Sequence, residues 1–206
     1  MLRVGLTGGI ASGKTTVAAL LRKYGAPVLD ADALGHELLS PGKAPHDEVL
    51  REFGDSVLGA GGTIDRAKLG SIVFSDAEKR GRLNAILHPP IMQEVQKWFA
   101  VLQSEGIAEL AFVEAALLVE AGYHKSLDRL VVCWCQPEQQ IERMMKRGLT
   151  QAQARLRLAS QMPADEKRRA ADRVIDCSGT LARTDQQVRE MLEALRDEAR
   201  MTPNVS

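Results

Sequence analysis

The chain has no surplus of charge of either sign. Lys plus Arg and Asp plus Glu both number 27 among its 206 residues, so the formal net charge is +0 at pH 7. A protein that holds nucleic acid or an anionic membrane through its overall field needs an excess of basic residues. We therefore expect neither partner, and any recognition of phosphate must be local.

Cysteine is scarce as well. Cys133, Cys135 and Cys177 are odd in number and show no C-x-x-C spacing. The sequence therefore predicts neither a disulfide framework nor a zinc site. We expect reduced thiols in a protein core, as is usual in the cytoplasm.

Long hydrophobic runs are also missing. Residues 1–7 are apolar but lead straight into glycines, unlike a signal peptide. The most apolar later stretch, residues 110–119, contains a glutamate and is far shorter than the ~20 residues that span a bilayer. The composition, 45% hydrophobic and 26% charged, is that of an ordinary globular protein. We expect a soluble cytoplasmic protein with no membrane partner, a monomer or small homo-oligomer.

Strand-like and helix-like segments alternate, which is typical of an α/β protein with a parallel sheet. Apolar residues at helical spacing predict a helix from Lys14 to Tyr24, and residues 32–104 have a helical pattern that predicts an inserted helical domain. That pattern breaks at 41–42, at 59–62 and at His88-Pro89-Pro90, with a capping box at Ser75-x-x-Glu78. Short apolar runs predict strands at 2–7, 26–29, 107–113, 128–135 and 173–176.

A polar helical segment lies between the last two predicted strands. Residues 137–173 carry nine basic and five acidic residues. This local excess suits a flap over polyphosphate, while a solvated helical face is the alternative. Capping boxes at Thr150-x-x-Gln153 and Thr184-x-x-Gln187 predict the start of a second helix in this segment and of the last helix of the chain.

Residues 8–15 read Gly-Gly-Ile-Ala-Ser-Gly-Lys-Thr and match G-x-x-x-x-G-K-[ST] between a predicted strand and a predicted helix. In such a loop, backbone N–H groups and the positive end of the helix surround phosphate oxygens. Lys14 would contact the β and γ phosphates of ATP, and the Thr15 hydroxyl would bind the Mg²⁺ that bridges them. The predicted ATP-binding residues here are Gly9, Ile10, Ala11, Ser12, Gly13, Lys14, Thr15 and Thr16.

Carboxylates follow two of the predicted strands. The second strand leads into Asp30-Ala31-Asp32, at the edge of a parallel sheet where the phosphate loop also lies. No N-K-x-D guanine motif occurs, and the aspartates suit an acceptor hydroxyl, although one of them could simply cap the next helix. Glu114 closes the third strand and is a candidate for holding a magnesium-bound water.

Three further side chains are candidates for the site. Arg143 and Arg147 are four residues apart, share one helix face and could reach the transferring phosphate, or could be ordinary surface arginines. His88, before two prolines, is either a catalytic group or a turn or core histidine.

The order of these motifs resembles that of the dephospho-coenzyme A kinases over about residues 3 to 179. The phosphate loop alone would be unspecific, but the other motifs are not shared with adenylate, shikimate or gluconate kinases. They are Val28-Leu29-Asp30-Ala31-Asp32, Leu83-Asn84-x-x-Leu87-His88-Pro89, Leu117-Leu118-Val119-Glu120, Arg143-x-x-x-Arg147, Ala154-Arg155, Ser160-Gln161-Met162-Pro163, Lys167, Asp172 and Val174-Ile175-Asp176.

The resemblance implies a P-loop fold of the nucleoside-monophosphate-kinase type, with a five-stranded parallel sheet flanked by helices. It implies a nucleotide-binding core at 1–31, 105–136 and 172–206, a helical coenzyme A domain at 32–104 and a lid at 137–171. The reaction implied is ATP-dependent phosphorylation of the ribose 3′-hydroxyl of dephospho-coenzyme A, which gives coenzyme A and ADP.

The resemblance also implies roles for individual residues. Asp32 would be the catalytic base and the lid arginines would close on ATP. The implied contacts of the acceptor are Thr7, Asp32, His88, Leu117 and Leu118.

Two positions depart from the family pattern. Ala116 stands where proline usually precedes the Leu-Leu pair, which could loosen the substrate wall. Cys177 stands where asparagine usually lies near the adenine of ATP, so a side-chain amide is lost.

Two other functions stay open from the residues alone. One is a P-loop kinase that acts on a nucleoside or nucleoside monophosphate, and the other is a non-catalytic NTP-binding switch. The segment from Leu83 to Pro89 favours the coenzyme A family over the first. Intact Lys14, Thr15 and Asp32 argue against the second.

Overall fold

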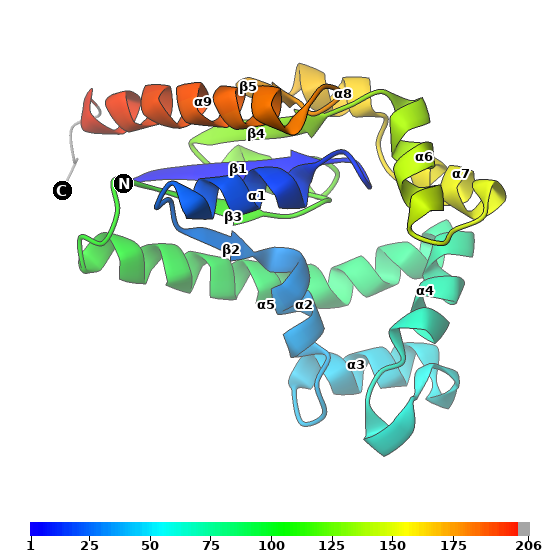
Figure 1. Cartoon of the computed structure of the whole chain (residues 1–206). Coiled ribbons are helices and arrows are strands. Elements are labelled where there is room, and N and C mark those ends of the chain that lie inside the picture. Colours follow the sequence, from blue (N-terminus) through cyan, green and yellow to red (C-terminus); the bar gives the residue numbers. More distant parts are fainter. Residues whose placement is uncertain (202–206) are drawn as a thin grey trace. The chain divides into compact units, whose positions relative to one another are not determined.

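The computed structural model describes residues 1–201, which fall into two compact units (Figure 1). Among the described residues, the first unit contains residues 1–30 and 98–201, and the second contains residues 31–97. None of the helices within the described residues is long and apolar enough to cross a membrane.

The first unit is built on a sheet of five parallel strands in the order β2-β3-β1-β4-β5. Because every pair is parallel, the carboxyl ends of all strands lie along one edge, where the loops that bind ligands are found in such sheets. The predicted α/β fold with a five-stranded parallel sheet is confirmed. The strands are β1 (Leu2–Gly8), β2 (Val28–Asp30), β3 (Leu110–Glu114), β4 (Arg129–Trp134) and β5 (Arg173–Asp176).

The central strands are buried because helices cover the sheet. Helices α1 (Lys14–Lys23) and α9 (Leu181–Met201) contact each other and bury their apolar residues against the strands (Figure 1). This core includes Leu6, Val17 and Leu192, each at most 2% exposed. Burial of apolar surface is the main force that fixes the frame of the sheet and hence the loops at its edge.

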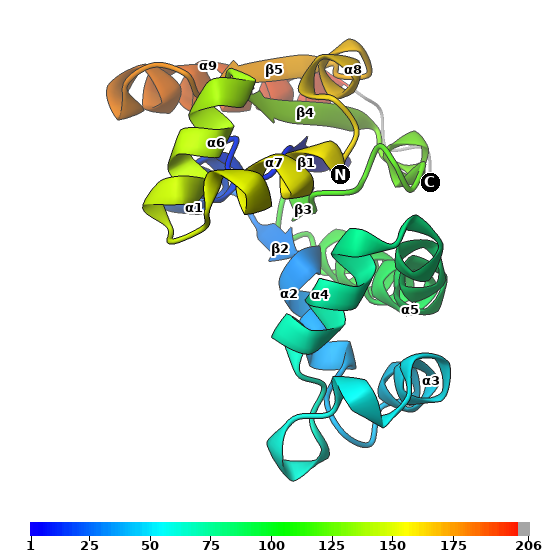
Figure 2. The ribbon, with the colours of Figure 1, turned by 90° about the vertical axis from the view of Figure 1, so that its right-hand side faces the viewer.

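The chain between β4 and β5 forms three helices (Figure 2). The second of these begins at the predicted capping box, in which Gln153 N donates to Thr150 Oγ1 at 3.3 Å and Thr150 N donates to Gln153 Oε1 at 2.9 Å. That prediction is confirmed. The helices are α6 (Pro137–Lys146), α7 (Gln151–Ala159) and α8 (Ala164–Arg169).

The second unit is helical and has its own apolar core. Val49, Val57, Leu69 and Val73 are buried there, and Leu87 packs against them. Its helices are α2 (Ala31–Leu38), α3 (Ala44–Phe53), α4 (Arg66–Ser75) and the larger part of α5 (Ala77–Ser104), with 3-10 turns at Asp55–Val57 and Ala60–Gly62.

The predicted break at His88-Pro89-Pro90 is wrong. Helix α5 runs without interruption through both prolines. Proline removes backbone donors and usually bends or ends a helix. Here, Leu83 and Leu87 pack into the core of the second unit before the prolines, and Val95 and Phe99 are buried after them. Packing on both sides holds the helix together against the local preference.

Two predicted capping boxes are also wrong. Ser75 is the last residue of α4, and Asp76 caps α5 by accepting from Glu78 N and Lys79 N at 3.0 and 3.1 Å. Helix α9 begins at Leu181 and not at the predicted Thr184, which is buried inside it.

Candidate functional site

The phosphate loop joins β1 to α1 through two residues in left-handed conformations. Ala11 has φ 57° and Gly13 has φ 108°. A Cβ on Gly13 would lie 2.8 Å from Cys177 Sγ, and a Cβ on Gly8 would lie 2.6 Å from the carbonyl oxygen of Cys133. Glycine is therefore required at these two positions by the close approach of neighbouring chain, and at Gly13 by its φ as well.

Two glutamines hold the tip of the loop. Gln140 Nε2 donates to Ile10 O at 2.7 Å, and Gln161 Oε1 accepts from Ile10 N at 2.8 Å. Gln140 comes from α6 and Gln161 from the link between α7 and α8. The peptide groups on both sides of Ile10 are thus fixed by the segment between β4 and β5.

Lys14 begins α1, and its ammonium lies 3.0 Å from Glu114 Oε1. The Glu114 side chain is 2% exposed, and its second oxygen lies 3.7 Å from Arg22 Nη2. Glu114 is the last residue of β3 and is in register with Asp30 of β2. A buried carboxylate therefore lies beside the loop lysine at the carboxyl edge of the sheet.

Oxygen atoms around the loop fit a hard divalent cation. The Thr15 hydroxyl lies in the exposed first turn of α1, and the Glu114 carboxylate ends the neighbouring strand. Ser12 Oγ is buried and has no hydrogen-bond partner among the described residues. Hydroxyl and carboxylate oxygens are the donors that Mg²⁺ prefers, usually together with phosphate oxygens of the substrate.

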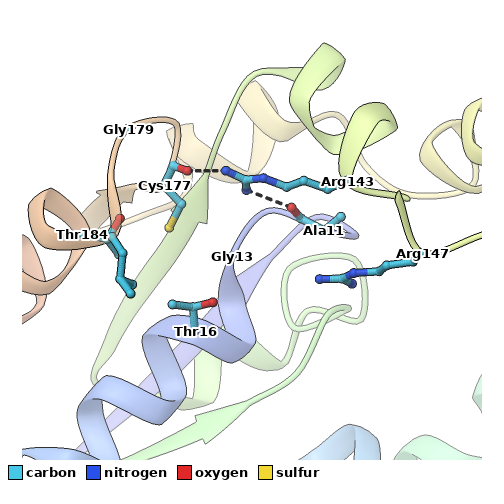
Figure 3. Close-up of a pocket in the computed structure, with 9 residues that line it drawn as sticks. Ala11, Gly13, Thr16, Arg143, Arg147, Cys177, Gly179 and Thr184 are labelled. Atoms are coloured by element: carbon cyan, nitrogen blue, oxygen red, sulfur yellow. Dashed lines mark hydrogen bonds between the residues drawn. The ribbon is translucent and has the colours of Figure 1, made fainter. Parts of the chain in front are cut away.

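A cavity of about 260 Å³ opens beside the loop (Figure 3). Arg143 forms one wall: its Nη1 donates to Ala11 O at 3.1 Å and its Nη2 to Cys177 O at 2.6 Å. Arg147, from the same helix end, also lines the cavity and is exposed. The lining residues are Ala11, Gly13, Thr16, Arg143, Arg147, Cys177, Gly179, Leu181 and Thr184.

The three cysteines are buried free thiols near this cavity. Cys135 Sγ accepts from Arg143 Nη1 at 3.4 Å. Burial raises the pKa of the Cys133 thiol, whereas a hydrogen bond from Cys133 lowers the pKa of Cys177. Cys177 lies on the loop after β5 and presents its carbonyl oxygen, not its thiol, to Arg143.

The predicted acceptor residues are distributed over both units. Asp32 is exposed in the first turn of α2, in the second unit. His88 lies within α5, and burial lowers its pKa. In the first unit, Thr7 Oγ1 donates to Ala116 O at 3.2 Å. Leu118 is 3% exposed and packs over Gly5, so Leu117 is the more accessible leucine of the pair.

Several residues around the loop were not singled out as site residues from the sequence. Gln140 shows no local signal beyond its place in a helical pattern. Gln161 and Lys167 belong to the family motifs, which is the one feature of the sequence that indicates a place near the site. Thr184 lines the cavity, whereas the sequence predicts it as a helix cap.

Known proteins share this architecture and sequence. A solved Thermus thermophilus structure superimposes with a TM-score of 0.78 at 35% identity and covers 98% of both chains. A Campylobacter jejuni structure named as a dephospho-CoA kinase gives a TM-score of 0.68 at 26% identity and covers 95% of this chain and 98% of that one.

Sequence relatives give the same result. A dephospho-CoA kinase of Symbiobacterium thermophilum is 44% identical over 186 residues, 90% of this chain and 77% of the relative. One of Anaeromyxobacter dehalogenans is 47% identical over 177 residues, 85% and 83% of the two chains. The family model described as dephospho-CoA kinase matches residues 2–183. The resemblance of the motifs is thereby confirmed, and the chain belongs to the dephospho-CoA kinase family.

Proposed function

We propose that this chain transfers the γ-phosphoryl group of ATP to the ribose 3′-hydroxyl of dephospho-coenzyme A, which completes coenzyme A and releases ADP. The observation that carries the proposal is the phosphate loop, in which Lys14 begins α1 beside the buried carboxylate of Glu114. Membership of the family supports the choice of acceptor.

The phosphate loop holds the triphosphate in this proposal. Backbone N–H groups at the beginning of α1, residues 13–16, surround the β and γ phosphates, and Lys14 adds a point charge there. The adenosine enters the cavity beside Gly13 and Cys177, where Arg143 already joins the two sides. Arg147 contributes positive charge to the transferring phosphate.

Magnesium would be held by Thr15 directly and by Glu114 through water, together with the β and γ phosphates. When bound, Mg²⁺ supplies neutralisation of the charge that develops on the phosphate oxygens. Glu114 would then be shared between Lys14 and the water of the cation, and Lys14 would contact the phosphates.

Asp32 acts as the base in this proposal. Its carboxylate accepts the proton of the 3′-hydroxyl as the hydroxyl oxygen forms a bond to the γ phosphorus and the bond from that phosphorus to the β–γ bridging oxygen breaks. Asp32 follows the carboxyl end of β2 by two residues. Thr7, His88 and Leu117 are the proposed contacts of the coenzyme A precursor, residues 32–104 its domain, and residues 137–171 the lid over ATP.

A panel of acceptors tests this function. ADP release is measured with dephospho-coenzyme A, adenosine, AMP and other nucleoside monophosphates at equal concentration, and the product is identified by mass. We expect rapid turnover with dephospho-coenzyme A alone. Turnover with only the nucleoside monophosphates would show the alternative kinase, and ATP binding without turnover on any acceptor would show a switch. In this proposal the enzyme acts in the cytoplasm as a monomer or small homo-oligomer.

A further inference from the structure

Lys167 is a fully buried lysine in the short helix α8. Its Nζ donates to Ala116 O at 2.7 Å and lies 2.8 Å from Glu120 Oε1. An ammonium loses its hydration when it is buried and is kept in the protein only where charge and hydrogen bonds replace the water. The two partners therefore fix the position of this side chain closely.

Both partners belong to the segment that follows β3, residues 115–120, which we call the wall loop. The wall loop begins next to Glu114 and contains Leu117 and Leu118. Its first residue is fixed by a hydrogen bond from Ala115 N to Leu6 O at 3.1 Å. The carbonyl oxygen of Ala116 then accepts from both Lys167 and the Thr7 hydroxyl.

A second contact joins the same two segments. Glu120 Oε1 accepts from Met162 N at 3.2 Å as well as from Lys167. Met162 is adjacent to Gln161, which holds the phosphate loop at Ile10. Residues 161–167 thus bond the phosphate loop through Gln161 and the wall loop through Met162 and Lys167.

The residue at position 116 explains why such an anchor matters in this chain. A proline there would restrict the backbone of the wall loop by its ring, and alanine does not. Two donors on one carbonyl oxygen, one of them a buried charge, restrict the loop from outside it.

We propose that Lys167 is a positioning residue for the acceptor: it fixes the wall loop in the conformation that receives dephospho-coenzyme A. The inference rests on the proposed function, because it assigns the wall loop to the acceptor and not to ATP. Lys167 itself touches neither substrate. Its loss should therefore affect the kinetics of the acceptor and leave those of ATP almost unchanged.

The test combines Lys167→Met, which keeps the length of the side chain and removes the charge, with Ala116→Pro, which restricts the loop without the lysine. Kinetics are measured for both substrates in the full-length wild type, both single variants and the double variant. We expect Lys167→Met to lower kcat/KM for dephospho-coenzyme A at least about tenfold and to change KM for ATP by less than about twofold. In the Ala116→Pro background, Lys167→Met should lower kcat/KM for dephospho-coenzyme A by less than about threefold.

Hydrogen exchange gives a readout that does not depend on turnover. Amides of the wall loop should exchange faster in Lys167→Met, whereas amides of β1 and α9 should keep their protection. Unchanged kcat/KM for dephospho-coenzyme A in folded Lys167→Met would overturn the inference. An equal loss of kcat/KM in both backgrounds, together with loss of amide protection throughout the sheet, would overturn it as well.

A further variant covers the case in which Lys167→Met does not fold. Glu120→Ala frees Met162 N and lets water reach the lysine, because the Glu120 side chain is already 22% exposed. Glu120→Ala should show the same faster exchange of the wall loop and the same loss of kcat/KM for dephospho-coenzyme A. If neither changes, the inference is again overturned. Wild-type turnover of dephospho-coenzyme A is measured first, so failure of the proposed function is seen separately from failure of the anchor.

Discussion

The ammonium of Lys14 lies 3.0 Å from Glu114 Oε1, and that carboxylate is 2% exposed. A buried carboxylate of the protein itself therefore holds the lysine of the phosphate loop at the edge of the sheet. Such an arrangement orients the side chain and also gives the carboxylate a partner that it needs in a dry environment. One ion pair thus links the lysine proposed to contact the phosphates with the carboxylate proposed to hold magnesium through water.

Replacement of Lys14 by alanine should abolish turnover, with a loss of at least about a thousandfold, because no neighbouring side chain restores a charge on the β and γ phosphates. Single-turnover phosphorylation measures the loss, and circular dichroism checks the fold. Lys23→Ala is the matched control, since Lys23 is the exposed last residue of the same helix. Near-normal activity of a folded Lys14→Ala protein would contradict the phosphate-loop interpretation.

Arg143 within α6 and Arg147 at its C-cap should behave differently. Arg143 bonds Ala11 O, Cys177 O and Cys135 Sγ, so its replacement by alanine should lower both kcat and the melting temperature. Arg147 is exposed and lines the same cavity, so alanine there should lower kcat by at least about tenfold and leave the melting temperature almost unchanged. Thermal melts with steady-state kinetics measure both. A change below tenfold at Arg147 would make it an ordinary surface arginine.

The different expectation for Arg143 comes from the structure. Four-residue spacing predicts a shared helix face, but it does not show which backbone carbonyl oxygens lie opposite that face. These oxygens belong to residues more than 30 positions away along the chain. Long-range partners of this kind come from tertiary packing and leave no local signal.

The strands were predictable because a buried parallel strand is a short apolar run that ends at glycines or carboxylates, as β1 and β3 do. The course of α5 was not, since Pro89 and Pro90 give a strong local signal for a break that packing overrides. Helix α9 shows a related failure. Only Thr184 is followed by glutamine three positions later, which favours a capping box there. The hydroxyl in the capping position is instead that of Thr180, whose Oγ1 accepts from Arg183 N at 3.3 Å.

Gln187, the other half of the box predicted at Thr184, has a tertiary role instead. Its Oε1 accepts from Asp176 N and its Nε2 donates to Asp176 O, each at 2.9 Å. The amide thus holds the last residue of β5, just before the loop that lines the cavity. Local capping preference alone could not reveal this competing use of the side chain.

Cys177 provides a test of base selection. If the family's asparagine amide normally distinguishes adenine, the wild type should use GTP better relative to ATP than Cys177→Asn does, by about tenfold. The ratio of kcat/KM for the two nucleotides measures this, with Cys177→Ser as the control for size and burial. An identical ratio in all three proteins would show that the backbone of residues 177–179 selects the base.

His46 predicts a pH dependence of stability in the second unit. Its Nδ1 lies 2.9 Å from Asp47 Oδ1 and its Nε2 lies 2.9 Å from Gly62 O, and both partners are acceptors. The hydrogen bond to Asp47, followed by that to Gly62, raises the pKa of His46 above its ordinary value. The protonated ring is therefore favoured in the folded chain.

Because the folded pKa is the higher one, this stabilisation is fully present below the unfolded pKa of about 6.5 and is lost as pH rises through the folded value. The difference in unfolding free energy between wild type and His46→Gln should shrink between about pH 6 and pH 9. Denaturant unfolding at several pH values measures it. A difference that is constant, or that grows with pH, would contradict the assignment.

Asp32 is the proposed base: a carboxylate after β2 takes the proton of the acceptor hydroxyl while the phosphate loop holds ATP. Asp32→Asn keeps the size and one acceptor oxygen but removes the basicity, whereas Asp30→Asn changes the residue that is in register with Glu114. If Asp30 supports magnesium-bound water or caps α2, its variant should change the magnesium dependence or the stability instead.

The decisive measurement is rapid-quench single-turnover phosphorylation of dephospho-coenzyme A at saturating magnesium, with ATP affinity measured in parallel for wild type, Asp32→Asn and Asp30→Asn. We expect Asp32→Asn to slow the transfer at least about a hundredfold and to leave ATP affinity almost unchanged. A wild-type rate in Asp32→Asn would contradict the claim, and a wild-type rate there beside an inactive Asp30→Asn would move the base to Asp30.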